Sequence, residues 1–226
     1  MSNITAAITA VGGYVPEYVL SNKVLETMVD TNDEWITTRT GIKERRLLKE
    51  EGKGTSYLGI KAAEDLIQKI DLDPTTIDLV IFATATPDMP VASSGAYLAS
   101  QIGAKNAFSY DLQAACSSFL YGMSTAASYV QSGRYKKVLL VGADKMSSII
   151  DYTDRATCII FGDGGGAVLF EPNEDGLGLQ DEILRSDGIG REFLKIDADA
   201  RAAGMGGAFT LVGSGAYLGL AKVHNT

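Results

Sequence analysis

The sequence has 226 residues, of which 46% are hydrophobic and 21% are charged. These proportions exclude a disordered chain and leave room for one large or two small domains. The formal net charge of −8 disfavours general binding to nucleic acid or to anionic membranes. No long apolar span, signal-peptide core, metal motif or disulfide framework is found, so the sequence predicts a cytoplasmic protein with reduced thiols, no metal and no membrane insertion.

Strand-like apolar runs alternate with helical stretches along the chain. Ser21 is expected to cap a helix that runs to residue 28, and Asn32 or Asp33 to cap the next, around 35–38, which Gly41 should end. Apolar spacing, caps and stops predict further helices at 55–70, from 93 or 94 to about 103, and at 117–131. Strands are predicted at 4–11, 79–83, 107–112, 137–141 and 167–170. The glycines at 12–13 are expected to end the first strand, and the run at 162–166 is expected to form a tight turn. The alternation predicts an α/β fold with a largely parallel sheet and with its chemistry at the C-terminal ends of the strands.

Cys116 is the sharpest candidate for chemistry. It follows a predicted strand and precedes a predicted helix. Free backbone N–H groups and the helix dipole at that position favour the thiolate, which is the nucleophilic form of cysteine. The alternative is a buried structural cysteine, and placement alone leaves the two about equal. Cys158 lies in an apolar run and is expected in the core.

The helix expected after Cys116 is rich in small residues, which allow close packing on more than one face. We therefore expect a buried central helix. Trp35, Arg39 and Arg155 could meet a phosphate-bearing ligand, because guanidinium groups suit phosphate and an indole face suits a purine. Each could equally be an ordinary surface or packing residue.

Five segments together resemble one family, β-ketoacyl-acyl-carrier-protein synthase III. The segments 29–36 (VDTNDEWI) and 39–42 (RTGI) are similar to its N-terminal signature, and 111–119 (DLQAACSSF) resembles its nucleophile motif. Two later signatures resemble 152–157 (YTDRAT) and 161–167 (FGDGGGA). Their order and spacing agree with the family, and the resemblance extends from residue 4 to about 196.

The resemblance implies a thiolase-like fold of two similar α/β halves, as a homodimer. It implies a transferase of fatty-acid biosynthesis in which a short acyl-CoA, such as acetyl-CoA, acylates the cysteine. Malonyl-acyl-carrier protein then loses carbon dioxide and attacks the thioester. Carried over by position, Cys116 is the nucleophile, and its backbone N–H supplies one oxyanion donor. Trp35 and Arg155 sandwich the adenine of coenzyme A, and Thr31 and Arg39 line the same opening. Acyl-CoA is a substrate here, and no other cofactor is implied.

The sequence departs from the family after about residue 197. A histidine and an asparagine from the family's second half hold the malonyl thioester, but the only histidine here is His224, beside Asn225 and without matching context. We therefore expect a nucleophile domain at 1–197, the first of the two halves, and an unmatched segment at 198–226. The shortened chain alone could be inactive. The alternatives are a non-catalytic acyl-CoA-binding or partner subunit, and a thiolase-fold synthase with another acyl substrate.

Overall fold

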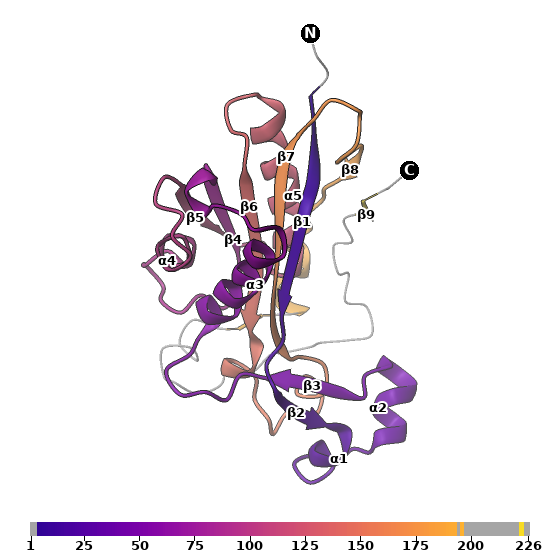
Figure 1. The fold of residues 1–226 in the computed structure, drawn as a ribbon. Helices are drawn as coiled ribbons and strands as arrows, with labels where there is room; N and C mark the ends of the chain where they lie inside the picture. Colours follow the sequence, from indigo (N-terminus) through magenta and orange to yellow (C-terminus); the bar gives the residue numbers. More distant parts are fainter. Residues whose placement is uncertain (1–3, 194, 197–221, 224–226) are drawn as a thin grey trace.

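The computed structural model describes residues 4–193, 195–196 and 222–223. Its centre is a five-stranded sheet in the order β1-β7-β6-β4-β5 (Figure 1). The bounds of these strands are Thr5–Tyr14 for β1, Asp163–Asn173 for β7, Val138–Lys145 for β6, Leu79–Ala83 for β4 and Phe108–Leu112 for β5. β4 pairs in parallel with both β5 and β6, whereas β7 runs antiparallel to β6 and β1. All strands except β7 therefore run the same way, which confirms the predicted α/β fold with a largely parallel sheet.

Helices cover both faces of this sheet (Figure 1). α3 (Thr55–Ile70) and α4 (Ser94–Gln101) pack on one face, where Leu58, Leu66 and Phe82 are fully buried. α5 (Ser118–Gln131) packs on the other face through Ala126 and Val130. Burying one such large apolar side chain contributes about 1.5–3 kcal/mol, so the two layers hold the sheet from both sides. The outer face of α5 is half-buried, so the helix is less enclosed than the sequence predicts.

A smaller module lies beyond the C-terminal end of β1 (Figure 1). It contains the antiparallel strands β2 (Tyr18–Ser21) and β3 (Glu44–Leu47) and the helices α1 (Asn22–Leu25) and α2 (Asp33–Thr40). Ser21 and Asn32 cap the helices as predicted, and Gly41 ends α2 with a φ of 74°. An apolar cluster that includes Leu25, Ile36, Cys158 and Ile159 joins the module to the segment before β7. The module therefore has its own small core.

Both glycine predictions were wrong, because all of these glycines except Gly162 lie inside strands. β1 continues through Gly12 and Gly13 to Tyr14, and β7 begins at Asp163 and includes all three following glycines. A Cβ atom on Gly12 would lie 2.3 Å from the carbonyl oxygen of Ala62, and one on Gly165 would lie 2.6 Å from that of Leu58. Both oxygens belong to α3. The glycines therefore let this helix sit directly on the sheet.

The remaining elements are short. They are the 3₁₀ turns η1 (Pro74–Thr76), η2 (Ala115–Ser117), η3 (Met146–Ser148) and η4 (Gly188–Phe193), and the paired strands β8 (Glu182–Ile183) and β9 (Lys222–Val223). α1 ends three residues earlier than expected. None of the helices in the described ranges is long and apolar enough to cross a bilayer. Apart from β9, the predicted segment 198–226, with His224, lies outside the described residues.

Candidate functional site

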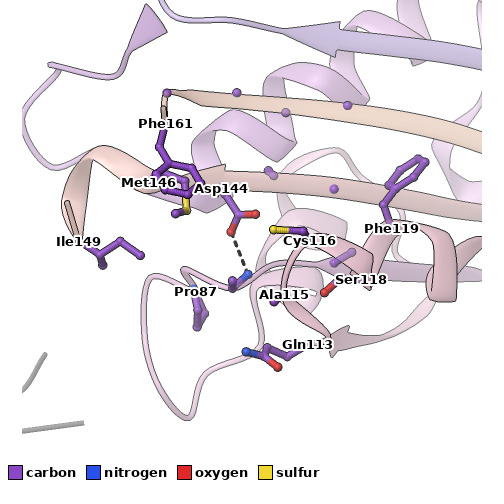
Figure 2. A pocket seen from close by; sticks show the side chains of 18 of the residues that line it. Pro87, Gln113, Ala115, Cys116, Ser118, Phe119, Asp144, Met146, Ile149 and Phe161 are labelled. Carbon is purple, nitrogen blue, oxygen red and sulfur yellow. Dashed lines mark hydrogen bonds between the residues drawn. The ribbon is translucent and has the colours of Figure 1, made fainter. Parts of the chain in front are cut away.

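The C-terminal ends of the parallel strands meet at one edge of the sheet and border a cavity of about 1360 Å³. The ends of β4 and β6 contribute Ala83 and Asp144, and the turn after β5 contributes Cys116. Met146 and Phe161 form part of its apolar wall. Figure 2 shows the sulfur of Cys116 and the carboxylate of Asp144 directed into this space. The predicted nucleophile thus lies where a parallel α/β sheet places its chemistry.

Cys116 is exposed, so a buried structural role does not apply to it. It lies in η2, the turn that joins β5 to α5. Two hydrogen bonds fix this turn: the backbone N–H of Ala114 donates to Ser118 Oγ over 2.6 Å, and that of Ser117 donates to the Ala114 carbonyl over 3.1 Å. Ala115 takes a φ of +48°, a left-handed conformation that costs an alanine free energy. The chain therefore holds the thiol in a strained, well-bonded turn before a helix.

Asp111, five residues before the cysteine, binds the start of α4. Its carboxylate accepts hydrogen bonds from the backbone N–H groups of Ser94 and Gly95 and from the hydroxyl of Ser93, each over 2.8 Å. A carboxylate at a helix N-terminus satisfies N–H groups that have no partner within the helix. This motif residue therefore fixes β5, and with it the start of the Cys116 turn, against α4.

Asp144 is a site residue that the sequence analysis missed. Its Oδ1 accepts hydrogen bonds from the backbone N–H of Ala85 over 2.8 Å and of Thr86 over 3.1 Å, and from the hydroxyls of Thr84 and Thr86 over 2.9 Å. These bonds hold the loop after β4 against the end of β6. A carboxylate just after a buried strand could have indicated this residue, but the apolar run predicts a strand that ends at residue 141, whereas β6 continues to Lys145.

The run at 162–166 also organises the site. Asp163 is buried, and its carboxylate accepts hydrogen bonds from the backbone N–H groups of Leu48 and Ser147 over 2.8 Å and from the Ser147 hydroxyl over 2.6 Å. It thereby joins the small module, the turn after β6 and the start of β7. The glycines that follow line the cavity with backbone alone.

The structure brings Trp35, Arg39 and Arg155 together. The guanidinium carbon of Arg39 lies 4.8 Å from the centre of the indole ring, and that of Arg155 lies 4.6 Å from it. An exposed ion pair of 3.7 Å also links Arg155 to Asp30. Thr31 immediately precedes the α2 cap, and its hydroxyl is buried without a hydrogen-bond partner in the described part of the chain. We call Thr31, Trp35, Arg39 and Arg155 the ligand mouth.

The ligand mouth and the cavity share one apolar cluster. Trp35 packs at the edge of this cluster together with Met146 and Phe161, which also line the cavity. The second cysteine, Cys158, is 1% exposed inside the same cluster, as the sequence predicts. Burial raises the pKa of the Cys158 thiol, and the carboxylate of Asp154 raises it further. Of the two thiols, only Cys116 is thus available to a substrate.

The family match and the curated relatives described here carry one family description. Residues 110–188 match the family described as 3-oxoacyl-[acyl-carrier-protein (ACP)] synthase III. Over 198 residues, the chain is 57% identical to beta-ketoacyl-[acyl-carrier-protein] synthase III 2 of Bacteroides thetaiotaomicron, a match that covers 88% of this chain and 59% of the relative. A beta-ketoacyl-[acyl-carrier-protein] synthase III of Chlorobium chlorochromatii is 56% identical over 191 residues, with 84% of this chain and 58% of the relative covered. The chain thus spans about three fifths of the length of these curated relatives.

Solved structures share the fold as well as the sequence. The crystal structure of 3-oxoacyl-[acyl-carrier-protein] synthase III from Aquifex aeolicus superposes with a TM-score of 0.85 at 39% identity, over 92% of this chain and 64% of that one. The priming beta-ketosynthase of the R1128 polyketide pathway also gives a TM-score of 0.85, at 32% identity, over 92% of this chain and 63% of that one. The sheet and helices described above are therefore those of a thiolase-like fold.

Proposed function

We propose that this chain, which is similar to the 3-oxoacyl-[acyl-carrier-protein] synthase III family over the residues that match, carries the acyl-accepting part of a condensing acyltransferase of fatty-acid synthesis. The observation that carries the proposal is the exposed Cys116 on the wall of a 1360 Å³ cavity, at the junction of a strand and a helix. The buried Cys158 could not reach a substrate in that cavity without unfolding its cluster.

The proposed first step is a thiol–thioester exchange. The Cys116 sulfur attacks the carbonyl carbon of a short acyl-CoA and forms a tetrahedral intermediate. The intermediate then expels the coenzyme A sulfur, which takes the proton that the Cys116 thiol has lost. The products are an acyl-cysteine thioester and free coenzyme A. The backbone N–H of Cys116 lies in the turn before α5, where N–H groups lack helical acceptors, and it is suited to stabilise the oxyanion.

The ligand mouth is the proposed site for the nucleotide end of coenzyme A. An adenine can stack between the indole of Trp35 and the guanidinium group of Arg155, and Thr31 and Arg39 can line the same opening. The two guanidinium groups already lie within 4.8 Å of the ring centre. This assignment is supported by the position of both arginines beside Trp35, which packs against the apolar cluster that continues into the cavity.

The second step is proposed for the whole protein. There, malonyl-acyl-carrier protein loses carbon dioxide and its carbanion attacks the acyl-cysteine, which gives a 3-oxoacyl-acyl-carrier protein and frees the thiol. A homodimer in the cytoplasm is the proposed setting, and no nucleic acid takes part. The alternative, a subunit that binds acyl-CoA without reacting, predicts a protein that is never acylated.

The test is the intact mass of the 226-residue chain after incubation with acetyl-CoA. The expected result is the gain of one acetyl group, mapped by peptide analysis to Cys116. Cys116→Ala is expected to abolish the gain, whereas Cys158→Ala, which removes the buried thiol, should retain it. Binding of acetyl-CoA without acylation would support the alternative, and labelling that persists in Cys116→Ala would refute the assignment of the nucleophile.

A further inference from the structure

Arg45 is buried although it carries a charge. It lies in β3 and is 4% exposed, and it is the only buried cation among the residues that the structure describes. Burial lowers the pKa of its guanidinium group. In the described ranges, no carboxylate forms an ion pair with it. Burying an unpaired charge costs more free energy than burying an apolar side chain of the same size, so packing alone does not explain an arginine here.

One end of the Arg45 guanidinium bonds to the base of α2 through Asn22. The Nη1 group donates to Asn22 Oδ1, and the Asn22 amide nitrogen in turn donates to Asp33 over 2.7 Å and to Thr37 over 3.3 Å. Asp33 and Thr37 lie on α2, the helix that carries Trp35 and therefore one wall of the ligand mouth. Asn22 is itself only 2% exposed, so water does not compete for these bonds.

The other end of Arg45 bonds to the segment that carries the opposite wall. Its Nε donates to the carbonyl oxygen of Ile159 over 2.9 Å, and its Nη2 donates to the same oxygen. Ile159 follows Arg155 by four residues. The turn between them is fixed by Asp154, which accepts from the backbone N–H of Ala156 over 2.9 Å and from the Thr157 hydroxyl over 2.6 Å. A displacement of the Ile159 carbonyl would therefore move Arg155.

We propose that Arg45 is a positioning residue that sets the spacing between the Trp35–Arg39 wall and the Arg155 wall of the ligand mouth. It is 114 residues from Ile159 in the sequence, so it bridges distant segments, and it is not among the residues that line the cavity. Only a planar guanidinium group can donate in both directions at once, because a lysine presents a single ammonium point. The proposal rests on the proposed function in one respect, namely that the ligand mouth binds the nucleotide end of coenzyme A.

The test compares two acyl donors. Acetyl-CoA needs the mouth, whereas S-acetyl-N-acetylcysteamine has the same thioester without the nucleotide and should not need it. The measured quantity is the ratio of two rates of Cys116 acylation, that by acetyl-CoA over that by the small thioester. We expect this ratio to fall about tenfold in Arg45→Met, because misplaced mouth residues no longer orient the nucleotide end of acetyl-CoA. A general loss of structure would instead slow both donors. In Arg45→Lys, which keeps the charge, the ratio of the two acylation rates is expected to fall by a similar factor. This variant decides the question if Arg45→Met does not fold.

Arg46 provides the matched control. It is the next residue of the same strand, but its side chain is 39% exposed and pairs with Glu44, so Arg46→Met should leave the ratio unchanged. Trp35 is the only tryptophan, so its fluorescence reports directly on the mouth. Acrylamide should quench it more strongly in both Arg45 variants than in the wild type. An unchanged ratio and unchanged quenching in a folded Arg45 variant would overturn the proposal.

The same measurements separate a failure of the proposed function from a failure of this inference. Adenosine 3′,5′-bisphosphate, the nucleotide end of coenzyme A alone, should slow acylation of the wild type by acetyl-CoA and leave the small thioester unaffected. If it slows neither reaction, the ligand mouth is wrongly assigned and the role of Arg45 is overturned with it. If it slows only acylation by acetyl-CoA, the assignment of the ligand mouth is supported. The ratio of the two acylation rates in the Arg45 variants then decides whether Arg45 positions the mouth.

Discussion

The contact between α3 and the sheet should be sensitive to a single methyl group. In Gly165→Ala, the new Cβ would lie 2.6 Å from the Leu58 oxygen and 2.9 Å from the Leu58 carbonyl carbon, whereas ordinary contacts begin at 3.4 Å. Both are backbone atoms, so α3 itself must retreat by several tenths of an ångström. Overpacking of this kind lowers the free energy of unfolding by about 1–3 kcal/mol. We expect a value of about 2–3 kcal/mol here, because the whole helix must move to relieve the contact. For a chain of this size, we expect the melting temperature to fall by roughly 4–12 °C.

Gly166→Ala is the matched control, because the neighbouring glycine faces the other side of the sheet. A Cβ there would meet only the Gly12 oxygen, at 3.9 Å, which is an ordinary contact. Urea denaturation of the wild type and of both variants, followed by circular dichroism, measures the difference in the free energy of unfolding. We expect Gly166→Ala to stay within about 0.5 kcal/mol of the wild type. Equal stability of the two variants would refute the reasoning that these glycines exist to admit α3.

Four other predictions concern the neighbourhood of the site. The Tyr152 hydroxyl is buried with no hydrogen-bond partner among the described residues, so Tyr152→Phe should raise the free energy of unfolding by about 1–2 kcal/mol, and a loss of stability would show that the hydroxyl is satisfied. Burial also raises the pKa of Tyr152 to about 12, so the wild type should lose stability as the pH rises from 10 to 12, and the phenylalanine variant should lose less in that window. Arg155→Ala should weaken acyl-CoA binding by about 1.5–3 kcal/mol in a calorimetric titration, and an unchanged affinity would contradict its place in the mouth. Iodoacetamide at pH 8 should alkylate Cys116 well before Cys158, because Cys158 is buried and burial raises the pKa of its thiol. Equal rates of alkylation would contradict the buried position of Cys158.

Elements with a regular pattern and a clear cap were predictable from the sequence. The bounds of α3 and β4 agree with the prediction at both ends, and α2 lies between its expected cap and its expected glycine stop. In α3, apolar residues such as Leu58 and Leu66 recur at helical spacing, and β4 is an uninterrupted apolar run. These signals are local, so the rest of the fold does not have to be known to use them.

Features that depend on what packs against a residue were not predictable in this way. The glycine pair at 12–13 reads as the end of a strand because the sequence does not show the α3 backbone that excludes a Cβ atom from Gly12. β3 reads as a polar segment because two of its four residues are arginines, and only the fold shows that Arg45 is buried and Arg46 is not. The proximity of Trp35 and Arg155 is likewise not predictable from local pattern, because the two residues are far apart in the sequence.

The fold holds the exposed thiol of Cys116 and the ligand mouth on different elements. Cys116 is fixed by the turn between β5 and α5, whereas Trp35 and Arg155 belong to the small module and to the segment before β7. These elements meet through the apolar side chains of Met146 and Phe161. The polar bonds that fix the thiol and those that fix the mouth involve different residues. We therefore expect that a change at Arg45 alters the proposed binding of coenzyme A and leaves the position of the Cys116 thiol unchanged. This separation is the reason that two thioesters, one with the nucleotide and one without, can measure binding and reactivity independently in the same chain.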